Sequence, residues 1–537
     1  MQSSIHAVEL VFLLLLLFIV VFGAIAQRLK IAYPIVLVIA GLLLSFVPGI
    51  PKITLNADVI FLVILPPLLY SGAWLTSWRE FSYNLVSIFF LAFGLVTFTV
   101  LAVAGTAHWF LPGFDWRVGL VLGAVVAPTD TIAATSIARR IGLPKRIVDI
   151  LEGESLLNDA SALLALEFGI AILAGAHTFT VSGGVLRLIY LTCAGIVVGL
   201  VVAEIVHLIE NRIDDAPIEV ALSILTPYVA YLAASWLNAS GVLAVVTCGL
   251  YLSRKSSHFF SPTVRLQAWA VWDSFTFILN GLVFVLIGLQ LPYVMEAIRD
   301  HSRLSLLEYG LSFSAFLIVL RLAWLFPGAY VANVIRRRIL GQNELMPRLR
   351  QIFVVGWTGM RGVISLAAAI ALPETIGGRS FEQRDMIIFL TFCVILVTLV
   401  LQGLTLPPLI RKLGLAGTPV PDREEEEARR AILEAALGSL EEFRNRPEPV
   451  FPEVYDDLAH HYRQRLAILN REDDDSEGPS KAALHDHFVK ISQELLRIER
   501  ETAVRLRNDS RISDELLRKI ERELDLSETH LAEKARG

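Results

Sequence analysis

The chain has 537 residues, of which 55 % are hydrophobic and 18 % charged, and its mean hydropathy is +0.60. A soluble chain carries charge on roughly a quarter of its residues, so this composition excludes a single soluble enzyme. Residues 1–420 contain 27 Lys or Arg and 23 Asp or Glu, whereas residues 421–537 contain 20 and 29. The sequence therefore predicts a membrane part followed by an acidic, water-exposed tail. The net charge of −5 argues against nucleic acid as the main partner.

Apolar runs close to the 20 residues that cross a bilayer as a helix recur throughout residues 1–410. They predict an all-α integral membrane domain with about thirteen transmembrane helices. These spans lie at about 5–27, 32–49, 55–75, 84–107, 117–138, 147–174, 181–206, 219–237, 240–253, 270–292, 309–331, 351–373 and 385–409.

Basic residues in the predicted connections indicate the orientation, because Lys and Arg are enriched in short cytoplasmic loops. Sixteen of them lie in one alternate set of connections, which begins with Arg28 and Lys30, and only six lie in the other set. We therefore expect the N-terminus outside and the charged tail in the cytoplasm, in a plasma (inner) membrane protein.

Thirteen spans divide into six, one linker and six, which would give two repeats of inverted topology. Span five then corresponds to span twelve, and both contain residues that interrupt a helix. Span five has a proline and polar residues at 127–130, and span twelve has three glycines within 356–362. Interrupted helices in corresponding positions indicate a binding site near the membrane midplane.

Four charged residues lie within two positions of the centres of spans five, six, eleven and twelve: Asp130, Asp159, Arg321 and Arg361. Ionisable groups at this depth are costly, and they usually mark a functional site. The alternative is that they form internal ion pairs that only hold helices together. We expect Arg321 to pair with Glu154, and Arg361 is the alternative partner.

Span six presents Glu154 below Asn158 and Ser155 below Asp159, each pair four residues apart on one helix face. Their carboxylate, hydroxyl and amide oxygens are hard donors that suit a small hard cation. Pro128 would help to unwind span five, so that the carbonyl of Thr129 could face the same cation. In span ten, we expect Asp273 to cap the helix, and Asn280 is a weaker candidate for lining the cation path.

These residues resemble the signature of the monovalent cation:proton antiporters, specifically the bacterial branch of the sodium/proton exchanger family. The resemblance extends over all thirteen predicted spans. One departure is Thr131, where many members of the family have proline. The matching motifs are Thr129-Asp130, Glu152-Gly153-Glu154-Ser155-Leu156-Leu157-Asn158-Asp159, Leu65-Pro66-Pro67-Leu68-Leu69, Arg321, and Gly359-Met360-Arg361-Gly362.

The resemblance implies a homodimeric exchanger in which Asp159 binds a cation and a proton alternately. It also implies that Ser155 and Thr129 coordinate the transported Na⁺, while Glu154 and Asp130 shape the site. Asn158 beside Asp159 is similar to the pair found in the electroneutral class. For Asp130, either Arg361 or the end of an interrupted helix could keep the carboxylate ionised.

Residues 411–421 form a predicted linker rich in glycine and proline, and residues 422–537 a charged helical tail. We expect tail helices at 424–443, 452–470, 481–508 and 512–534, with an acidic break at 473–479.

The sequence thus predicts a secondary antiporter that exchanges Na⁺, Li⁺ or K⁺ for H⁺ in the service of pH and cation homeostasis. No enzymatic activity and no cofactor are expected. A K⁺-preferring exchanger is the first alternative. A membrane-anchored cation or pH sensor that acts through its tail is the second, but a sensor needs no interrupted helices and no four charges at the midplane.

Overall fold

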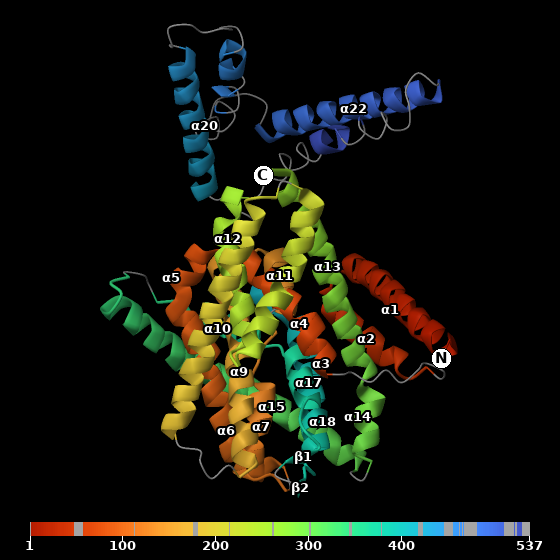
Figure 1. Cartoon of the computed structure of the whole chain (residues 1–537), viewed down its shortest axis with the longest axis vertical. Coiled ribbons are helices and arrows are strands. Elements are labelled where there is room, and N and C mark those ends of the chain that lie inside the picture. Colours follow the sequence, from red (N-terminus) through yellow and green to blue (C-terminus); the bar gives the residue numbers. More distant parts are fainter. Residues whose placement is uncertain are drawn as a thin grey trace. The chain divides into compact units, whose positions relative to one another are not determined.

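The computed structural model is almost entirely helical (Figure 1). It describes residues 2–47, 57–111, 113–130, 132–175, 181–213, 215–259, 262–299, 302–342, 346–376, 379–416 and 423–444, and in the tail 455–460, 462–463, 466, 481–509, 520 and 523–528. The chain divides into two compact units, Met1–Gly417 and Thr418–Gly537.

The described helices of the first unit extend from Gln2 to Lys412. Up to residue 173 they are α1 (Gln2–Leu29), α2 (Tyr33–Leu44), α3 (Ala57–Val59), η1 (Ile60–Ile64), α4 (Leu65–Leu75), α5 (Trp78–Phe89), η2 (Phe90–Leu95), α6 (Val96–Phe110), α7 (Trp116–Val126), α8 (Ile132–Ile141) and α9 (Lys145–Leu173). Beyond it they are α10 (Val181–Glu210), α11 (Ala216–Trp236), α12 (Gly241–Phe259), α13 (Pro262–Leu289), α14 (Leu291–Ala297), α15 (Arg303–Arg338), α16 (Leu349–Trp357), α17 (Val363–Ile370), α18 (Arg384–Val397), η3 (Thr398–Gln402) and α19 (Gly403–Lys412).

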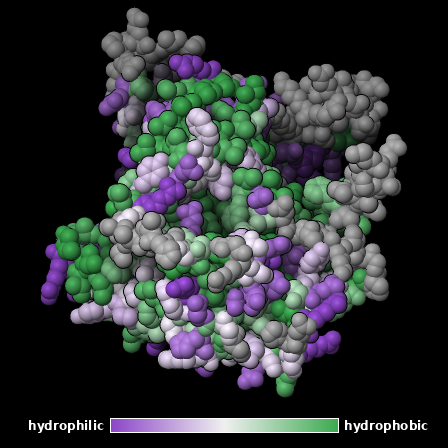
Figure 2. All heavy atoms as spheres, turned by 60° about the horizontal axis from the view of Figure 1, so that its bottom comes forward, coloured by the Kyte–Doolittle hydropathy of each residue, from purple (hydrophilic) through white to green (hydrophobic). Residues whose placement is uncertain are grey.

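Among the described residues, nine helical segments are long and apolar enough to cross a membrane. The shorter helices α2 and α7 are also apolar. Many large apolar side chains on these helices are exposed, such as Trp236 at 86 %. Figure 2 shows hydrophobic residues over much of the visible surface, with hydrophilic ones gathered on the end that faces the viewer. Exposed apolar surface of this extent fits contact with lipid, and the chain is a multi-pass membrane protein.

Glycines allow a close helix crossing between α2 and α13. A Cβ on Gly41 would lie 2.6 Å from the carbonyl oxygen of Val285, and a Cβ on Gly288 would lie 2.5 Å from that of Val38. Helix backbones can approach this closely in a membrane only where the side chains are small. The crossing therefore depends on both glycines.

Prolines lie after two of the π-helical segments. Pro66 and Pro67 lie in the first turn of α4, directly after the π-helix η1, and Pro407 and Pro408 lie in α19, which follows the π-helix η3. Proline has no N–H to donate to the carbonyl four residues earlier, so Pro66 leaves the carbonyl of Leu62, inside η1, without its usual α-helical partner.

Two segments without helix lie inside the helical unit, and they are where the candidate site forms. Helix α7 ends at Val126 and α8 begins at Ile132, while α16 ends at Trp357 and α17 begins at Val363. The first segment contains Pro128, and the second contains Gly359 and Gly362.

The predicted start of span ten is wrong. Helix α13 begins at Pro262 rather than at residue 270, so Asp273 lies inside the helix and does not cap it. Helix α19 continues to Lys412, into the first two residues of the predicted linker 411–421. Two strands, β1 (Thr375–Ile376) and β2 (Arg379–Ser380), pair antiparallel, and the sequence analysis did not predict them.

The second unit contains α20 (Arg423–Arg444) and α22 (Lys481–Asn508). Residues 455–460 and 523–528 are also helical. On α22, Arg497 forms ion pairs with Glu494 and Glu501, which lie three residues before and four residues after it. These pairs stabilise the charged surface of the helix. The predicted acidic break at 473–479 and most of the predicted helix 512–534 lie outside the described residues.

Candidate functional site

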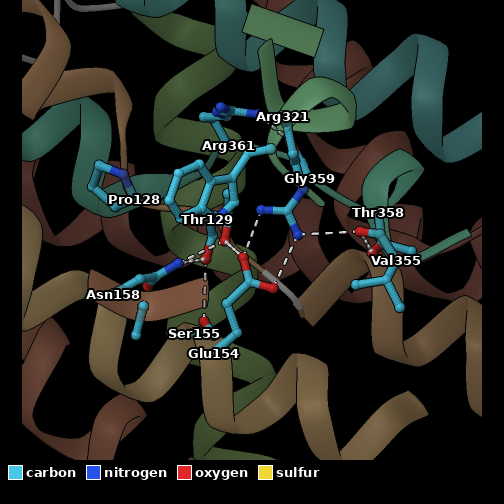
Figure 3. Close-up of polar contacts among 12 residues, drawn as sticks. Pro128, Thr129, Glu154, Ser155, Asn158, Arg321, Val355, Thr358, Gly359 and Arg361 are labelled. Carbon is cyan, nitrogen blue, oxygen red and sulfur yellow. Dashed lines mark hydrogen bonds and ion pairs between the residues drawn. The ribbon is translucent and has the colours of Figure 1, made fainter. Parts of the chain in front are cut away.

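Residues of both non-helical segments, among them Thr129 and Gly359, lie around the side chains of Arg321 and Glu154 (Figure 3). The backbone N–H of Asp130 in the first segment donates to the carbonyl of Met360 in the second over 2.8 Å, and the hydroxyl of Ser365, in the first turn of α17, donates to the carbonyl of Pro128 over 3.4 Å. A backbone that leaves helical geometry inside a membrane protein must find such partners. The hydrogen bond between Asp130 and Met360 therefore satisfies one backbone group of each interruption.

Charged side chains lie at the helix ends that these interruptions create. The Oδ1 atom of Asp130 accepts the backbone N–H of Ile132, at the N-terminus of α8, over 2.9 Å. The Nε of Arg361 donates to the carbonyl of Val126, at the C-terminus of α7, over 3.2 Å. A carboxylate at a helix N-terminus and a guanidinium at a C-terminus both complement the helix dipole. Of the two possible partners for Asp130, the structure shows the helix N-terminus.

Glycine is required at two positions because charged side chains pack on the backbone there. A Cβ on Gly362 would collide with the carboxylate of Asp130, and a Cβ on Gly359 would collide with the guanidinium of Arg321. Any larger residue would displace one of these charges. The glycines of span twelve therefore make room for charges that come from α15 and from the first interruption.

Arg321 of α15 and Glu154 of α9 form a buried bidentate ion pair. The Nη1–Oε1 distance is 2.5 Å, the Nη2–Oε2 distance is 3.0 Å, and the two side chains are 1 % and 0 % exposed. Nη2 also donates to the carbonyl of Val355 over 3.2 Å. The predicted pairing of Arg321 with Glu154 is thus confirmed, and Arg361 instead donates to backbone carbonyls.

Thr129 is the centre of a hydrogen-bond network that joins the first interruption to α9. Its hydroxyl donates to Oε1 of Glu154 over 3.0 Å and accepts from Nδ2 of Asn158 over 2.6 Å. Its carbonyl accepts from the hydroxyl of Ser155 over 3.2 Å. Glu154 therefore accepts hydrogen bonds from both Arg321 and Thr129, and both of its carboxylate oxygens have partners.

Asp159 differs from the other buried carboxylate of α9. It is 4 % exposed and lies close enough to Asp130 to interact with it electrostatically, and no hydrogen bond joins its side chain to another described residue. Next to it in sequence, the Oδ1 atom of Asn158 is also buried without a hydrogen-bond partner in the described part of the chain. Unpartnered buried oxygens of this kind are free to coordinate a cation.

The structure adds residues that the sequence analysis did not assign to the site. Thr398 accepts the backbone N–H of Arg361 over 3.1 Å, and Ser365 contacts the first interruption as described above. Tyr33 lies within electrostatic reach of Asp130 and beside Asn280. The sequence signal for Thr398 is a polar residue within an apolar span. Thr131, the departure from the family motif, lies outside the described residues.

Comparisons with known proteins show which family the chain belongs to. The family model described as "Sodium/hydrogen exchanger, transmembrane" matches residues 13–412. The chain belongs to the sodium/hydrogen exchanger family. An uncharacterised Na⁺/H⁺ exchanger of Mycobacterium tuberculosis is 33 % identical to it over 520 residues, which cover 96 % of this chain and 95 % of the relative. The relatives are transporters rather than enzymes.

Two relatives have names that specify the ions. The sodium, potassium, lithium and rubidium/H⁺ antiporter of Bacillus pumilus is 32 % identical over 454 residues, 82 % of this chain and 66 % of that one. The Na⁺/H⁺ antiporter ApNhaP of Aphanothece halophytica is 32 % identical over 414 residues, 76 % of this chain and 75 % of that one.

A solved structure shows the same fold for this exchanger. The sodium proton antiporter MjNhaP1 from Methanocaldococcus jannaschii at pH 8 superposes with a TM-score of 0.56 and 21 % sequence identity, covering 78 % of this chain and all of that one.

Proposed function

We propose that the chain exchanges Na⁺ or Li⁺ for H⁺ across the plasma membrane, and that Asp159 binds the cation and the proton alternately. The observation that carries this proposal is the contrast between the two buried acidic residues of α9. Glu154 is held by Arg321 and Thr129, whereas Asp159 is buried without a hydrogen-bond partner among the described residues. A buried carboxylate in this state needs either a proton or a cation.

The oxygens around Asp159 supply a coordination shell. Na⁺ would be bound by the Asp159 carboxylate, the Ser155 hydroxyl and the Thr129 carbonyl, and the unpartnered Oδ1 of Asn158 is a further ligand. All of these are hard oxygen donors, and the network around Thr129 orients them before a cation arrives. Asp130 and Glu154 shape the site, and Arg321 and Arg361 compensate charge.

The membrane topology belongs to the same proposal. We place thirteen spans in a six, one and six arrangement, with inverted repeats that bring the two interruptions together near the midplane. The N-terminus would lie outside, the tail in the cytoplasm, and the protein would work as a homodimer. The backbone hydrogen bond between Asp130 and Met360 supports the crossing of the two interruptions.

We propose an electroneutral cycle of one cation for one proton. Asn158 has an amide where a second titratable carboxylate would allow two protons per cycle. Arg321 compensates the charge of Glu154, and Asp130 accepts a hydrogen bond from the backbone N–H of Ile132 at the N-terminus of α8. Na⁺ and H⁺ then leave the site with the same charge, so the membrane potential has nothing to act on.

The transported cation distinguishes two candidate functions of the same class, a Na⁺-preferring and a K⁺-preferring exchanger. The Bacillus relative is named for four alkali cations and the Aphanothece relative for Na⁺. A K⁺-preferring exchanger is therefore the alternative, since the oxygen ligands suit any alkali cation. A sensor is less favoured, because it would need neither the two helix interruptions nor the four charged residues near them. No cofactor is needed, and pH and cation homeostasis would be the physiological role.

Proteoliposomes test the proposal directly. The protein is reconstituted with a pH dye in the lumen, and gradients of Na⁺, Li⁺ or K⁺ are imposed in turn. Luminal pH should respond to Na⁺ and Li⁺. A clamp of the potential with K⁺ and valinomycin then tests stoichiometry, because Na⁺-driven rates should not change with the clamped potential. Rates that change several-fold would show that Asp130 or Glu154 also titrates.

A further inference from the structure

A cavity of 760 Å³ opens in the membrane unit between two groups of helices. One wall comes from α1, α2 and α13, which pack against one another, and the other from α8 and α19, which also pack together. Three basic residues line it: Lys30, Arg140 and Arg411. The volume is typical of a ligand pocket, and no acidic residue is among its lining residues.

The three basic residues come from separate parts of the chain, and all three side chains are exposed to the cavity or solvent. In the described part of the chain, none of them forms an ion pair. Like charges that converge on a concave surface repel one another, and together they create a strongly positive potential. Such a surface selects an anion.

The backbone of Lys30 provides a second, independent observation. Its φ is +58°, in the left-handed region, and it closes α1 with hydrogen bonds from Lys30 N–H to Gln27 and from Ile31 N–H to Ala26, of 3.2 and 3.1 Å. Glycine usually occupies this position because it takes the conformation without strain. Lysine here is strained, which is explained if its charge is needed in the cavity.

The rest of the cavity wall is apolar. Phe277, Leu404 and Pro407 line it, and the neighbouring helix α1 carries exposed apolar side chains such as Leu17 and Val20, at 59 % and 61 %. An occupant that fits both parts must be anionic at one end and apolar along its length. We propose that this cavity binds the phosphate head group of an anionic phospholipid, whose acyl chains lie against α1. A soluble phosphate would use the basic residues but not the apolar wall.

The bound lipid would have two consequences. It would bridge Lys30 in one helix group to Arg140 and Arg411 in the other, and so hold the two groups at a fixed separation. Tyr33, which also lines the cavity, lies within electrostatic reach of Asp130. A phosphate would therefore offset the positive potential that opposes cation entry from this side. This second consequence rests on the proposed exchange, whereas binding does not.

Binding is measured on the full-length protein in detergent, as the rise in unfolding temperature when phosphatidylglycerol is added. The test variant is Lys30→Gln/Arg140→Gln/Arg411→Gln. The control is Arg79→Gln/Lys145→Gln/Arg338→Gln, which removes three exposed basic residues outside the cavity. Each basic residue near a lipid phosphate contributes roughly a fivefold factor in affinity, so half-saturation should shift by about 100-fold in the test variant only.

A second variant guards against misfolding. Lys30→Gly removes one charge and relieves the strained backbone, so without lipid it should be at least as stable as the wild type, while its lipid affinity falls about fivefold. Equal stabilisation of the wild type and the triple variant would overturn the proposal, as would an equal effect of phosphatidylcholine. If inorganic phosphate alone gave the same stabilisation, the site would take a free anion and the lipid assignment would be wrong. Exchange assays play no part in these outcomes, so binding can fail or succeed independently of transport.

Discussion

Breaking the Arg321–Glu154 pair should destabilise the membrane unit far more than breaking an exposed pair. Glu154→Gln leaves the guanidinium of Arg321 buried at 1 % exposure, with the carbonyl of Val355, 3.2 Å away, as its hydrogen-bond acceptor among the described residues. Arg321→Gln leaves a carboxylate at 0 % exposure. Removal of one partner of a buried ion pair costs about 3–5 kcal/mol. Glu154→Gln also weakens the acceptor for the Thr129 hydroxyl, a hydrogen bond worth about 1 kcal/mol.

The assay is a double-mutant cycle on the free energy of unfolding, measured by denaturant titration in detergent. Because the double variant leaves no uncompensated charge, its cost should be smaller than the sum of the single costs by about 1–3 kcal/mol. The control is Arg139→Gln, which breaks the Arg139–Glu152 pair. Those side chains are 2.6 Å apart and 58 % and 19 % exposed, so the loss should stay below about 1 kcal/mol.

Additivity would refute the reasoning. If the single costs summed to the double cost within about 0.5 kcal/mol, Arg321 and Glu154 would not be energetically coupled. Arg321 would then not compensate the charge of Glu154, and Glu154 would become a candidate for carrying a second proton.

Three other predictions address the site. Asp159→Asn should reduce exchange to below a few per cent of wild type in dye-loaded proteoliposomes while the protein remains folded by size-exclusion chromatography; greater residual exchange would remove Asp159 from the cycle. Gly362→Ala should lower stability by about 1–3 kcal/mol and impair exchange, because its Cβ collides with Asp130, whereas Gly105→Ala, with nothing within 4 Å, should leave both nearly unchanged. Asn158→Asp should make the rate depend on a clamped potential if the amide is what limits the cycle to one charge, and an unchanged rate would contradict that role.

The part of the site that could be predicted from the sequence is the part determined by depth and spacing. Asp130, Asp159, Arg321 and Arg361 lie near the centres of apolar spans. A midplane arginine requires a carboxylate partner, and Glu154, at a similar depth, is the residue that pairs with Arg321. The i,i+4 spacing likewise placed Ser155 and Asn158 on one face of α9, where both contact Thr129.

What could not be predicted depends on backbone direction where no helix exists. The partners of Arg361 are the carbonyls of Val126 and Gly359, and hydropathy says nothing about where a non-helical carbonyl points. The start of a helix is also poorly predicted by hydropathy. Hydropathy predicts that span ten begins at residue 270, whereas α13 begins at Pro262. Proline suits the first helical position because its nitrogen needs no hydrogen-bond partner there.

The charges around the two interruptions support a single exchangeable site when each is followed to its partner. Arg321 neutralises Glu154, the N-terminus of α8 receives Asp130, and Arg361 faces carbonyls at the C-terminus of α7. Each of these charges is matched by a fixed dipole or an opposite charge, so protonation of Glu154 or Asp130 would leave a partner unsatisfied inside the protein. The side chain of Asp159 has no hydrogen-bond partner among the described residues. Its neutralisation by H⁺ or by Na⁺ would therefore leave every other pair intact. In the exchange proposed above, the arrangement that stabilises the two crossed interruptions would also confine titration to one carboxylate, and one cation would then be exchanged for one proton.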